Sequence, residues 1–216
     1  MIRKSIIFLL FYVIVANTRA QEIDTTQVLG DVQDSVSFFS SDVVLLSKEE
    51  LAQQKMYTSL ELALKEPDKV YKLSLREKNL KLFPLEIVDF PNLQYLDLYG
   101  NKMGEIPVEI EKCKKLQYLD ISYNQLTNLP VEIGTLINLE ELYVKYNQLL
   151  EIPREIGGLL ALQKLDISHN RLVGLPDEIM MLESLIVLYL KENNFSAAER
   201  DRIRKMRRQW LTIYLN

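Results

Sequence analysis

A 23-residue repeat is the feature of this sequence that most constrains its fold. The segment LQYLDLYGNKMGEIPVEIEKCKK, residues 93–115, matches the next 23 residues, LQYLDISYNQLTNLPVEIGTLIN, and the pattern continues to residue 195. Leucine or valine opens each unit, at Val70, Leu93, Leu116, Leu139, Leu162 and Leu185. A fixed period in the twenties indicates a stacked solenoid, because one such unit can bury its apolar face only against its neighbours.

Each unit combines one short strand with a crossover segment. If each unit is numbered from its opening residue, apolar side chains occupy positions 1, 4, 6 and 11, as in Leu116, Leu119, Ile121 and Leu126. Alternation at positions 4 and 6 is strand spacing, and it turns positions 3, 5 and 7 to the opposite face. Parallel strands need a crossover of about a dozen residues, which the rest of the unit supplies. The sequence therefore predicts an α/β solenoid with a parallel sheet.

Two further columns of the repeat have structural explanations. Position 9 is asparagine at Asn101, Asn124, Asn147, Asn170 and Asn193, where its amide can bond the backbone groups of a buried turn. The crossovers read FPLEI, IPVEI, LPVEI, IPREI and LPDEI. Proline suits the first turn of a helix, and the glutamate two residues later meets the positive helix end. We interpret Glu86, Glu109, Glu132, Glu155 and Glu178 as helix starts rather than acid/base groups.

The units resemble leucine-rich repeats of the 23-residue class LxxLxLxxNxLxxLPxxI. The resemblance covers residues 70–195, about three-fifths of the chain, and includes Ras-group and scaffold-type repeat proteins as well as exported bacterial ones. It implies a curved horseshoe of about six full coils with a parallel concave sheet that binds proteins or other large ligands. Lys78 stands at the asparagine position of the first unit, as expected of an atypical terminal coil.

Residues 1–20, MIRKSIIFLLFYVIVANTRA, have the form of a secretory signal peptide. Arg3 and Lys4 precede an apolar run from Ile6 to Ala16, which is shorter than the roughly 20 residues of a membrane span. We expect export to the periplasm, cell surface or medium, and no stable membrane insertion after cleavage. A cytoplasmic chain that retains these residues is the alternative.

The charge balance argues against nucleic-acid partners. The chain carries 26 basic and 30 acidic residues, and loss of residues 1–20 would leave 23 basic residues and a net charge of about −7. Contacts with phosphate need lysine and arginine, so we expect no binding of nucleic acid.

Segments on both sides of the repeats are expected to close the solenoid. Residues 21–57 begin polar and acidic, and we expect a linker or a partly disordered segment there. Capping boxes at residues 47–50 and 58–61 indicate helix starts, and residues 58–69 are expected to form an N-terminal capping helix.

Residues 196–216 are expected to form a C-terminal cap, as a helix plus a closing strand. A capping box starts at Ser196, and the helix is expected to run from Ala197 to about Arg208. Its apolar stripe consists of Ile203, Met206 and Trp210. Positions 1, 4 and 6 of one more strand are filled by Trp210, Ile213 and Leu215. Capping therefore explains this basic helix better than binding to an anionic membrane.

Cysteine and histidine are each present once and indicate no metal site, cofactor or catalytic triad. Cys113 stands in a column held elsewhere by leucine or phenylalanine, which indicates a core position. His169 has no second histidine or cysteine nearby, so zinc and a histidine-based triad lack partners. By analogy with the family, a signal peptide without cysteine-paired caps points to a bacterial exported protein.

Asp97 and Asp120 are the one pair of residues with a catalytic spacing. Both stand at position 5, and neighbouring parallel strands lie about 4.8 Å apart, a spacing near that of paired catalytic carboxylates and open to calcium. An open sheet offers no water-excluding pocket in which one carboxyl group stays protonated. We therefore prefer solvated aspartates paired with a basic partner, and a carbohydrate-active enzyme is the least favoured alternative.

Tyrosine is concentrated on the expected concave face. Strand preference alone would equally favour threonine, valine and isoleucine there, and only Val187 occurs among them. Tyrosine offers a large contact area with few rotors to freeze, as binding surfaces favour. The predicted ligand-binding residues are Tyr95, Asp97, Tyr99, Tyr118, Asp120, Tyr123, Tyr143, Lys145, Tyr146, Lys164, Asp166, His169 and Tyr189.

The preferred interpretation is a non-enzymatic module that binds a protein or a surface glycan on this face. Replacement of Tyr118 and Tyr143 by alanine should abolish ligand capture without loss of the fold. An intracellular scaffold or adaptor of a GTPase pathway, as the Ras-group resemblance allows, is the alternative.

Overall fold

The computed structural model describes residues 44–206 and 208–216. The predicted signal peptide, residues 1–20, and residues 21–43 of the predicted linker lie outside these ranges. The predicted boundaries between segments of the chain stay predictions. In the described part, no helix has the length and apolar character that a membrane crossing needs.

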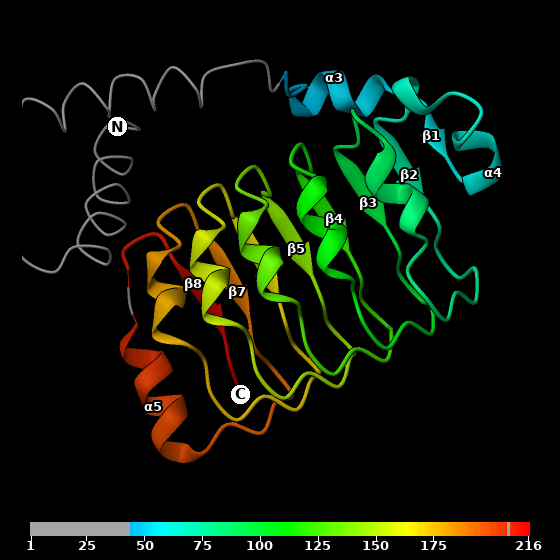
Figure 1. The fold of residues 1–216 in the computed structure, drawn as a ribbon. Helices are drawn as coiled ribbons and strands as arrows, with labels where there is room; N and C mark the ends of the chain where they lie inside the picture. Colours follow the sequence, from blue (N-terminus) through cyan, green and yellow to red (C-terminus); the bar gives the residue numbers. More distant parts are fainter. Residues whose placement is uncertain (1–43, 207) are drawn as a thin grey trace, which may run out of the picture. The chain divides into compact units, whose positions relative to one another are not determined.

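Eight parallel strands form one open sheet in sequence order, which confirms the predicted solenoid (Figure 1). The strands are β1 (Met56–Tyr57), β2 (Lys72–Ser74), β3 (Tyr95–Asp97), β4 (Tyr118–Asp120), β5 (Glu141–Tyr143), β6 (Lys164–Asp166), β7 (Val187–Tyr189) and β8 (Thr212–Tyr214). The register follows the repeat, since Leu96 pairs with Leu119 and Leu119 with Leu142. At the last strand Ile213 pairs with Leu188, as the sequence predicted.

The apolar positions of the repeat form one continuous core. Leu116, Leu119 and Ile121 have no exposed surface, and the same positions of the other coils are buried with them. Cys113 belongs to this core as predicted, and its burial raises the pKa of the thiol to about 12. This side chain therefore fills space as a neutral apolar group.

The asparagine column joins each coil to the coil before it. Asn124 Oδ1 accepts from the backbone N–H of Met103, and its Nδ2 donates to the carbonyl groups of Leu98 and Ile121. Equivalent bonds are made by Asn101, Asn147, Asn170 and Asn193. The column has the structural role that the sequence predicted, because it pairs buried backbone groups at the turn.

The crossovers contain five short 3-10 helices that follow the strands around each coil (Figure 1). They are η2 (Leu85–Asp89), η3 (Val108–Lys112), η4 (Val131–Thr135), η5 (Arg154–Gly158) and η6 (Asp177–Met181). A proline precedes each one as the N-cap residue, where its extended ψ lies outside the helix. The predicted position of proline inside the first turn is therefore wrong by one residue, whereas the glutamates do lie in the first turn.

Residues 44–69 form four short elements. Ser47 and Glu50 make the complete capping box that starts α3 (Lys48–Gln53). After β1 follow α4 (Leu60–Ala63) and η1 (Pro67–Lys69). The N-cap of α4 is Ser59, whose hydroxyl accepts from the N–H of Leu62, so the predicted cap at residue 58 is wrong by one.

The C-terminal helix α5 (Ala197–Lys205) packs on the last coils and leads into β8. Ile203 and Met206 are buried, as the predicted stripe requires. Trp210 is 55% exposed, so its predicted place in the buried stripe is wrong, whereas the pairing of Ile213 with Leu188 agrees with the predicted register of the closing strand. The helix ends at Lys205, before the predicted end near residue 208, and a turn then carries Trp210 outward ahead of β8.

Candidate functional site

The side chains at positions 3, 5 and 7 lie on the sheet face opposite the core, which we call the concave face. On it the aspartates of position 5 are held by the turn that ends each strand. Asp97, Asp120 and Asp166 each accept, through Oδ1, from the backbone N–H two residues later, at 3.1, 2.9 and 3.1 Å. All three are buried, with exposed fractions of 3, 7 and 7%. The prediction that these aspartates are solvated is therefore wrong, because the bonded turn and neighbouring side chains cover them.

Arg76 is the basic partner that the sequence analysis expected for the first two aspartates. Its guanidinium lies 2.8 Å from Asp97 Oδ2 and 3.8 Å from Asp120 Oδ2, and 4.0 Å from the centre of the Tyr99 ring. The hydrogen bond with Asp97 raises the pKa of Arg76, and burial raises the pKa of Asp120. Ion pairing and backbone hydrogen bonds thus hold both carboxylates in place.

Three tyrosines at positions 3 and 5 form a group that we call the floor stack: Tyr95, Tyr118 and Tyr143. The rings of Tyr95 and Tyr118 are parallel within 7° and 4.2 Å apart, and Tyr143 lies 5.4 Å from Tyr118 at a tilt of 44°. Tyr143 also donates a hydrogen bond of 2.6 Å to Glu141. Burial raises the pKa of Tyr118 and Tyr143, so these phenols stay protonated at neutral pH.

A second group, which we call the rim stack, consists of Tyr99, Tyr123, Tyr146 and His169. The distances between successive ring centres are 4.8, 4.2 and 3.9 Å, and the His169 ring is parallel to that of Tyr146 within 8°. Tyr123 and Tyr146 are each 40% exposed. His169, which the sequence analysis included among the predicted ligand-binding residues, is thus the last ring of an ordered aromatic series.

Position 8 has a left-handed backbone in every full coil. Tyr123, Tyr146 and His169 have φ values of 54°, 54° and 52°, and Gly100 fills the same position with a φ of 70°. Glycine adopts this conformation freely, whereas a bulky side chain adopts it only at an energetic cost. The repeat spacing did not predict this conformation, which three of the four rim-stack residues share.

The later coils carry the remaining predicted residues in mixed charge pairs. Lys145 lies 4.0 Å from Asp166, and Lys164 lies 3.3 Å from Glu141 and 5.7 Å from the centre of the Tyr143 ring. Tyr189 stacks on Tyr214 of the closing strand at 4.7 Å. Within residues 44–206 and 208–216, no group of three histidine, cysteine or acidic side chains could hold a metal ion.

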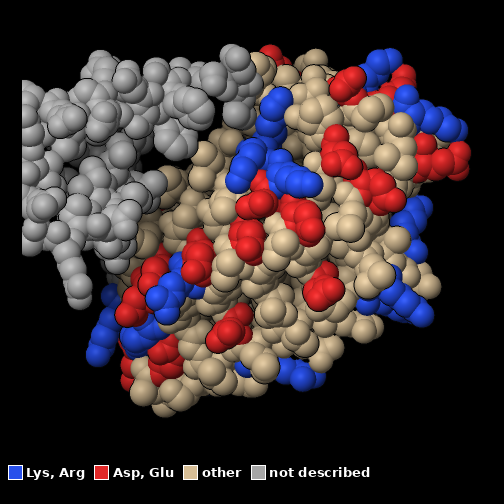
Figure 2. All heavy atoms as spheres, in the orientation of Figure 1, with Lys and Arg blue, Asp and Glu red and all other residues tan. Residues whose placement is uncertain are grey.

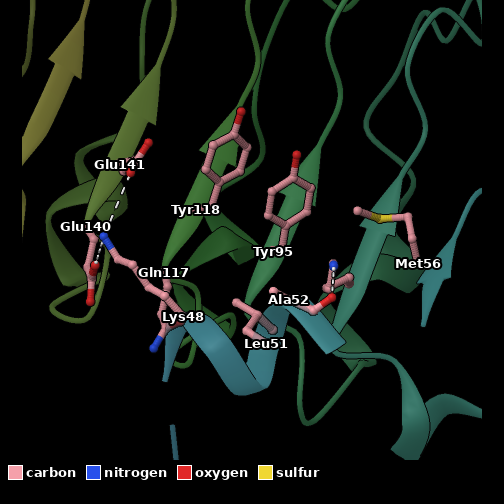
Figure 3. Close-up of a pocket in the computed structure, with 10 residues that line it drawn as sticks. Lys48, Leu51, Ala52, Met56, Tyr95, Gln117, Tyr118, Glu140 and Glu141 are labelled. Atoms are coloured by element: carbon pink, nitrogen blue, oxygen red, sulfur yellow. Dashed lines mark hydrogen bonds and ion pairs between the residues drawn. The ribbon is translucent and has the colours of Figure 1, made fainter. Parts of the chain in front are cut away.

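Helix α3 lies beside Tyr95 and Tyr118 of the floor stack, which the sequence analysis did not predict. A cavity of about 340 Å³ lies between them, lined by Leu51 and Ala52 of α3 and by Met56, Tyr95 and Tyr118 of the sheet (Figure 3). The position-2 column beside it reads Gln94, Gln117, Glu140 and Gln163. This run of amide and acidic side chains is the one sequence signal that could have indicated a contact there.

The predicted binding residues therefore fall into two regions. The first, with Tyr95 and Tyr118, lies under α3. The second comprises the rim stack and the later coils, where Tyr189 stacks on Tyr214 of the closing strand. Figure 2 shows acidic and basic side chains interspersed on the face in view, without a continuous basic patch.

Comparisons with known proteins agree with the repeat pattern. A family model described as leucine rich repeat matches residues 114–172, and one described as leucine rich repeats in two copies matches residues 91–132. None of the curated proteins matches this chain.

Two solved structures are similar in both sequence and fold. A leucine-rich repeat protein of Leptospira interrogans is 37% identical with a TM-score of 0.59, over 66% of this chain and 42% of that chain. The leucine-rich repeat ectodomain of a plant membrane receptor kinase from Arabidopsis thaliana, solved in complex with CASPARIAN STRIP INTEGRITY FACTOR 2, is 32% identical with a TM-score of 0.54. That match covers 59% of this chain and 16% of the receptor chain. This chain thus spans less than half the length of either relative.

Proposed function

Since the chain is a leucine-rich repeat protein, a class whose repeat domains commonly mediate protein binding, we propose that it captures a protein ligand on its concave face. The proposed contact surface is the rim stack together with Tyr143, Lys145, Lys164, Asp166 and Tyr189. The plant relative, whose repeat ectodomain was solved in complex with CASPARIAN STRIP INTEGRITY FACTOR 2, supports this kind of function.

The observation that carries this proposal is the left-handed backbone of Tyr123 and Tyr146. Strand preference explains a tyrosine inside a strand, but position 8 lies beyond the strand, and the same left-handed backbone carries glutamate at Glu77 and Glu192 and glycine at Gly100. Retention of two large, 40% exposed aromatic rings at these positions is easier to explain by a contact with a ligand. Tyrosine is suited to that role because its ring and hydroxyl supply apolar and polar contact together.

The test compares two double variants in a capture experiment with the full chain. Tyr123→Ser with Tyr146→Ser removes the centre of the rim stack, and Val108→Ser with Val131→Ser removes exposed apolar area elsewhere. Ligands are captured from extracellular and envelope proteins of the source organism. We expect the tyrosine variant to lose capture at least about tenfold and the valine variant to retain it. Equal capture by both variants would refute the proposed surface.

We propose a non-catalytic role for Asp97 and Asp120. Both carboxylates bond to backbone N–H groups and lie beside Arg76, which supports a structural function. Replacement of both by asparagine should lower stability. Detection of a hydrolytic activity that disappears in this double variant would overturn the proposal.

We further propose that the protein is exported from a bacterial cell. The composition of residues 1–20 and the similarity to the Leptospira protein support this location. The N-terminal sequence and intact mass of the protein from fractionated native cells test it. A mature start at Gln21 in the periplasmic, surface or medium fraction is expected, and an intact Met1 in the cytosol would contradict it.

A further inference from the structure

The segment that contains α3 is held at the edge of the sheet by two glutamines of neighbouring coils. The backbone N–H of Leu46 donates to Gln94 Oε1 at 2.9 Å, and Gln117 Nε2 donates to the carbonyl of Leu46 at 3.1 Å. The backbone N–H and the backbone carbonyl of Leu46 are thus both hydrogen-bonded to glutamine side chains of the repeat. Such contacts recognise a peptide backbone whatever its side chain.

Ionic contacts fix the helix that follows. Lys48 Nζ lies 2.9 Å from Glu140 Oε2, and Lys72 Nζ donates to the carbonyl of Ala52 at 3.3 Å. These contacts reach from β2 to the coil of β5, so the segment that contains α3 is joined to several of the first coils (Figure 3).

The fit of α3 to this surface is incomplete. Leu51 is the one buried residue of the helix, and a cavity of about 340 Å³ remains between α3 and the floor stack. Gln94 is fully buried, yet its Nε2 has no hydrogen-bond partner in the described ranges. A fully buried donor without a partner is uncommon in native proteins and points to an acceptor that α3 does not provide.

We propose that this surface is a docking site for a short amphipathic helix of a protein partner, and that α3 occupies it until the partner displaces α3. This inference goes beyond the proposed function, because it concerns a second surface that is separate from the rim stack. The occupant carries a lysine or arginine for Glu140 near its start. It carries an aromatic side chain where α3 has Leu51, because phenylalanine or tryptophan fills the space that leucine leaves.

The probe is a labelled peptide of residues 44–55 in which Leu51 is replaced by tryptophan. It is titrated into the full chain and into the full-length Leu51→Asp variant, in which α3 no longer docks. A tethered helix acts at a high effective concentration, so the unaltered chain should bind the peptide at least about tenfold more weakly than the variant. A peptide with Leu51→Asp is the matched control and should bind neither chain.

Two further measurements identify the site. In the Leu51→Asp background, Gln94→Leu with Gln117→Leu should lower peptide affinity at least about tenfold, since both backbone contacts are lost. Tyr123→Ser with Tyr146→Ser should leave peptide affinity unchanged. The experiment therefore distinguishes a failure of the proposed ligand capture by the rim stack from a failure of the proposed docking site under α3. Hydrogen exchange in β3–β7 checks that each variant keeps its coils, and Leu51→Ala replaces Leu51→Asp if it does not.

Equal affinity of the unaltered chain and the variant would overturn the proposal, because α3 would then not compete for the site. Absence of peptide binding by a correctly folded variant would overturn it as well.

Discussion

At the C-terminal end, α5 packs Ile203 and Met206 onto the last coils, and Arg202 bonds Glu199, Asp177 and the carbonyl of Leu175. At the N-terminal end, β1 and α4 close the core in the same way, with Tyr57 and Ala63 buried. Helix α3 has no counterpart at the other end. It lies on the concave face, and Leu51 is its one buried residue.

The difference between the two ends indicates that the fold needs α5 and does not need α3. A terminal coil exposes apolar surface and requires a cap, because solenoid units gain stability from their neighbours. The concave face needs no cover, since its side chains are polar or amphipathic and already paired within the sheet. We infer that α5 belongs to the cooperative unit and that α3 opens separately from it.

The largest contrast is expected from truncation of one buried side chain at each end. Ile203→Ala should lower the free energy of unfolding by about 2–5 kcal/mol, because Ile203 has no exposed surface and leaves a cavity in the core. Urea unfolding followed by circular dichroism measures this change.

Leu51→Ala is the matched variant at the other end. It should change the free energy of global unfolding by less than about 1 kcal/mol, because α3 is expected to detach before the coils unfold. A loss as large as that of Ile203→Ala would show that α3 is part of the cooperative unit.

The C-terminal end should also respond to acid. The hydrogen bonds from Arg202 lower the pKa of Glu199 below its ordinary value of 4.5. A depressed carboxyl pKa stabilises the folded state above pH 4.5, and this contribution is lost as the pH falls from about 4.5 through the folded pKa. Thermal unfolding between pH 7 and pH 3 should show a smaller acid-induced decrease in Tm for Glu199→Gln. Identical pH profiles would contradict this role of Glu199.

The glutamine column allows a sharper comparison along the face. Gln117→Leu removes one contact with Leu46 and should weaken the attachment of α3 by about 0.5–1.5 kcal/mol. Gln163→Leu changes the same position two coils later, where no described residue of α3 makes a hydrogen bond, and should have no effect on α3. Hydrogen exchange of the α3 amides distinguishes the two, and equal effects would contradict the assignment of the contact.

The smallest effect is expected from Lys48→Ala. The side chain of Lys48 is 59% exposed, and pairs of this kind contribute about 0–1 kcal/mol. The same exchange experiment should show a slight acceleration in α3 at low salt and none at high salt, because salt screens the pair.

The sequence predicted the coils well because their geometry is set by local spacing. Leu96, Leu119 and Leu142 pair in register, and Asn124 makes the bonds expected of its column. A period of 23 residues places each such side chain without reference to any distant contact. The face that carries the tyrosines followed from the same spacing.

The contact of α3, the left-handed turns and the exposure of Trp210 were not predicted, because residue spacing does not encode them. The contact of Leu46 with Gln117 joins residues 71 positions apart, and one of them lies outside the repeat. The left-handed backbone of Tyr146 is a property of the turn, and a tyrosine at that position gives no sign of it. Trp210 is exposed because a turn follows Met206, whereas the apolar pattern alone placed it in the core.

The account is tested most directly by native-state hydrogen exchange of the full chain at several subdenaturing urea concentrations. The reporters are amides that bond within each helix: Leu51 and Gln54 for α3, and Arg200 and Met206 for α5. We predict fast exchange with little dependence on urea in α3, and slow, steeply urea-dependent exchange in α5 together with the coils. Exchange of the α3 amides with the same free energy and urea dependence as those of α5 would contradict the account.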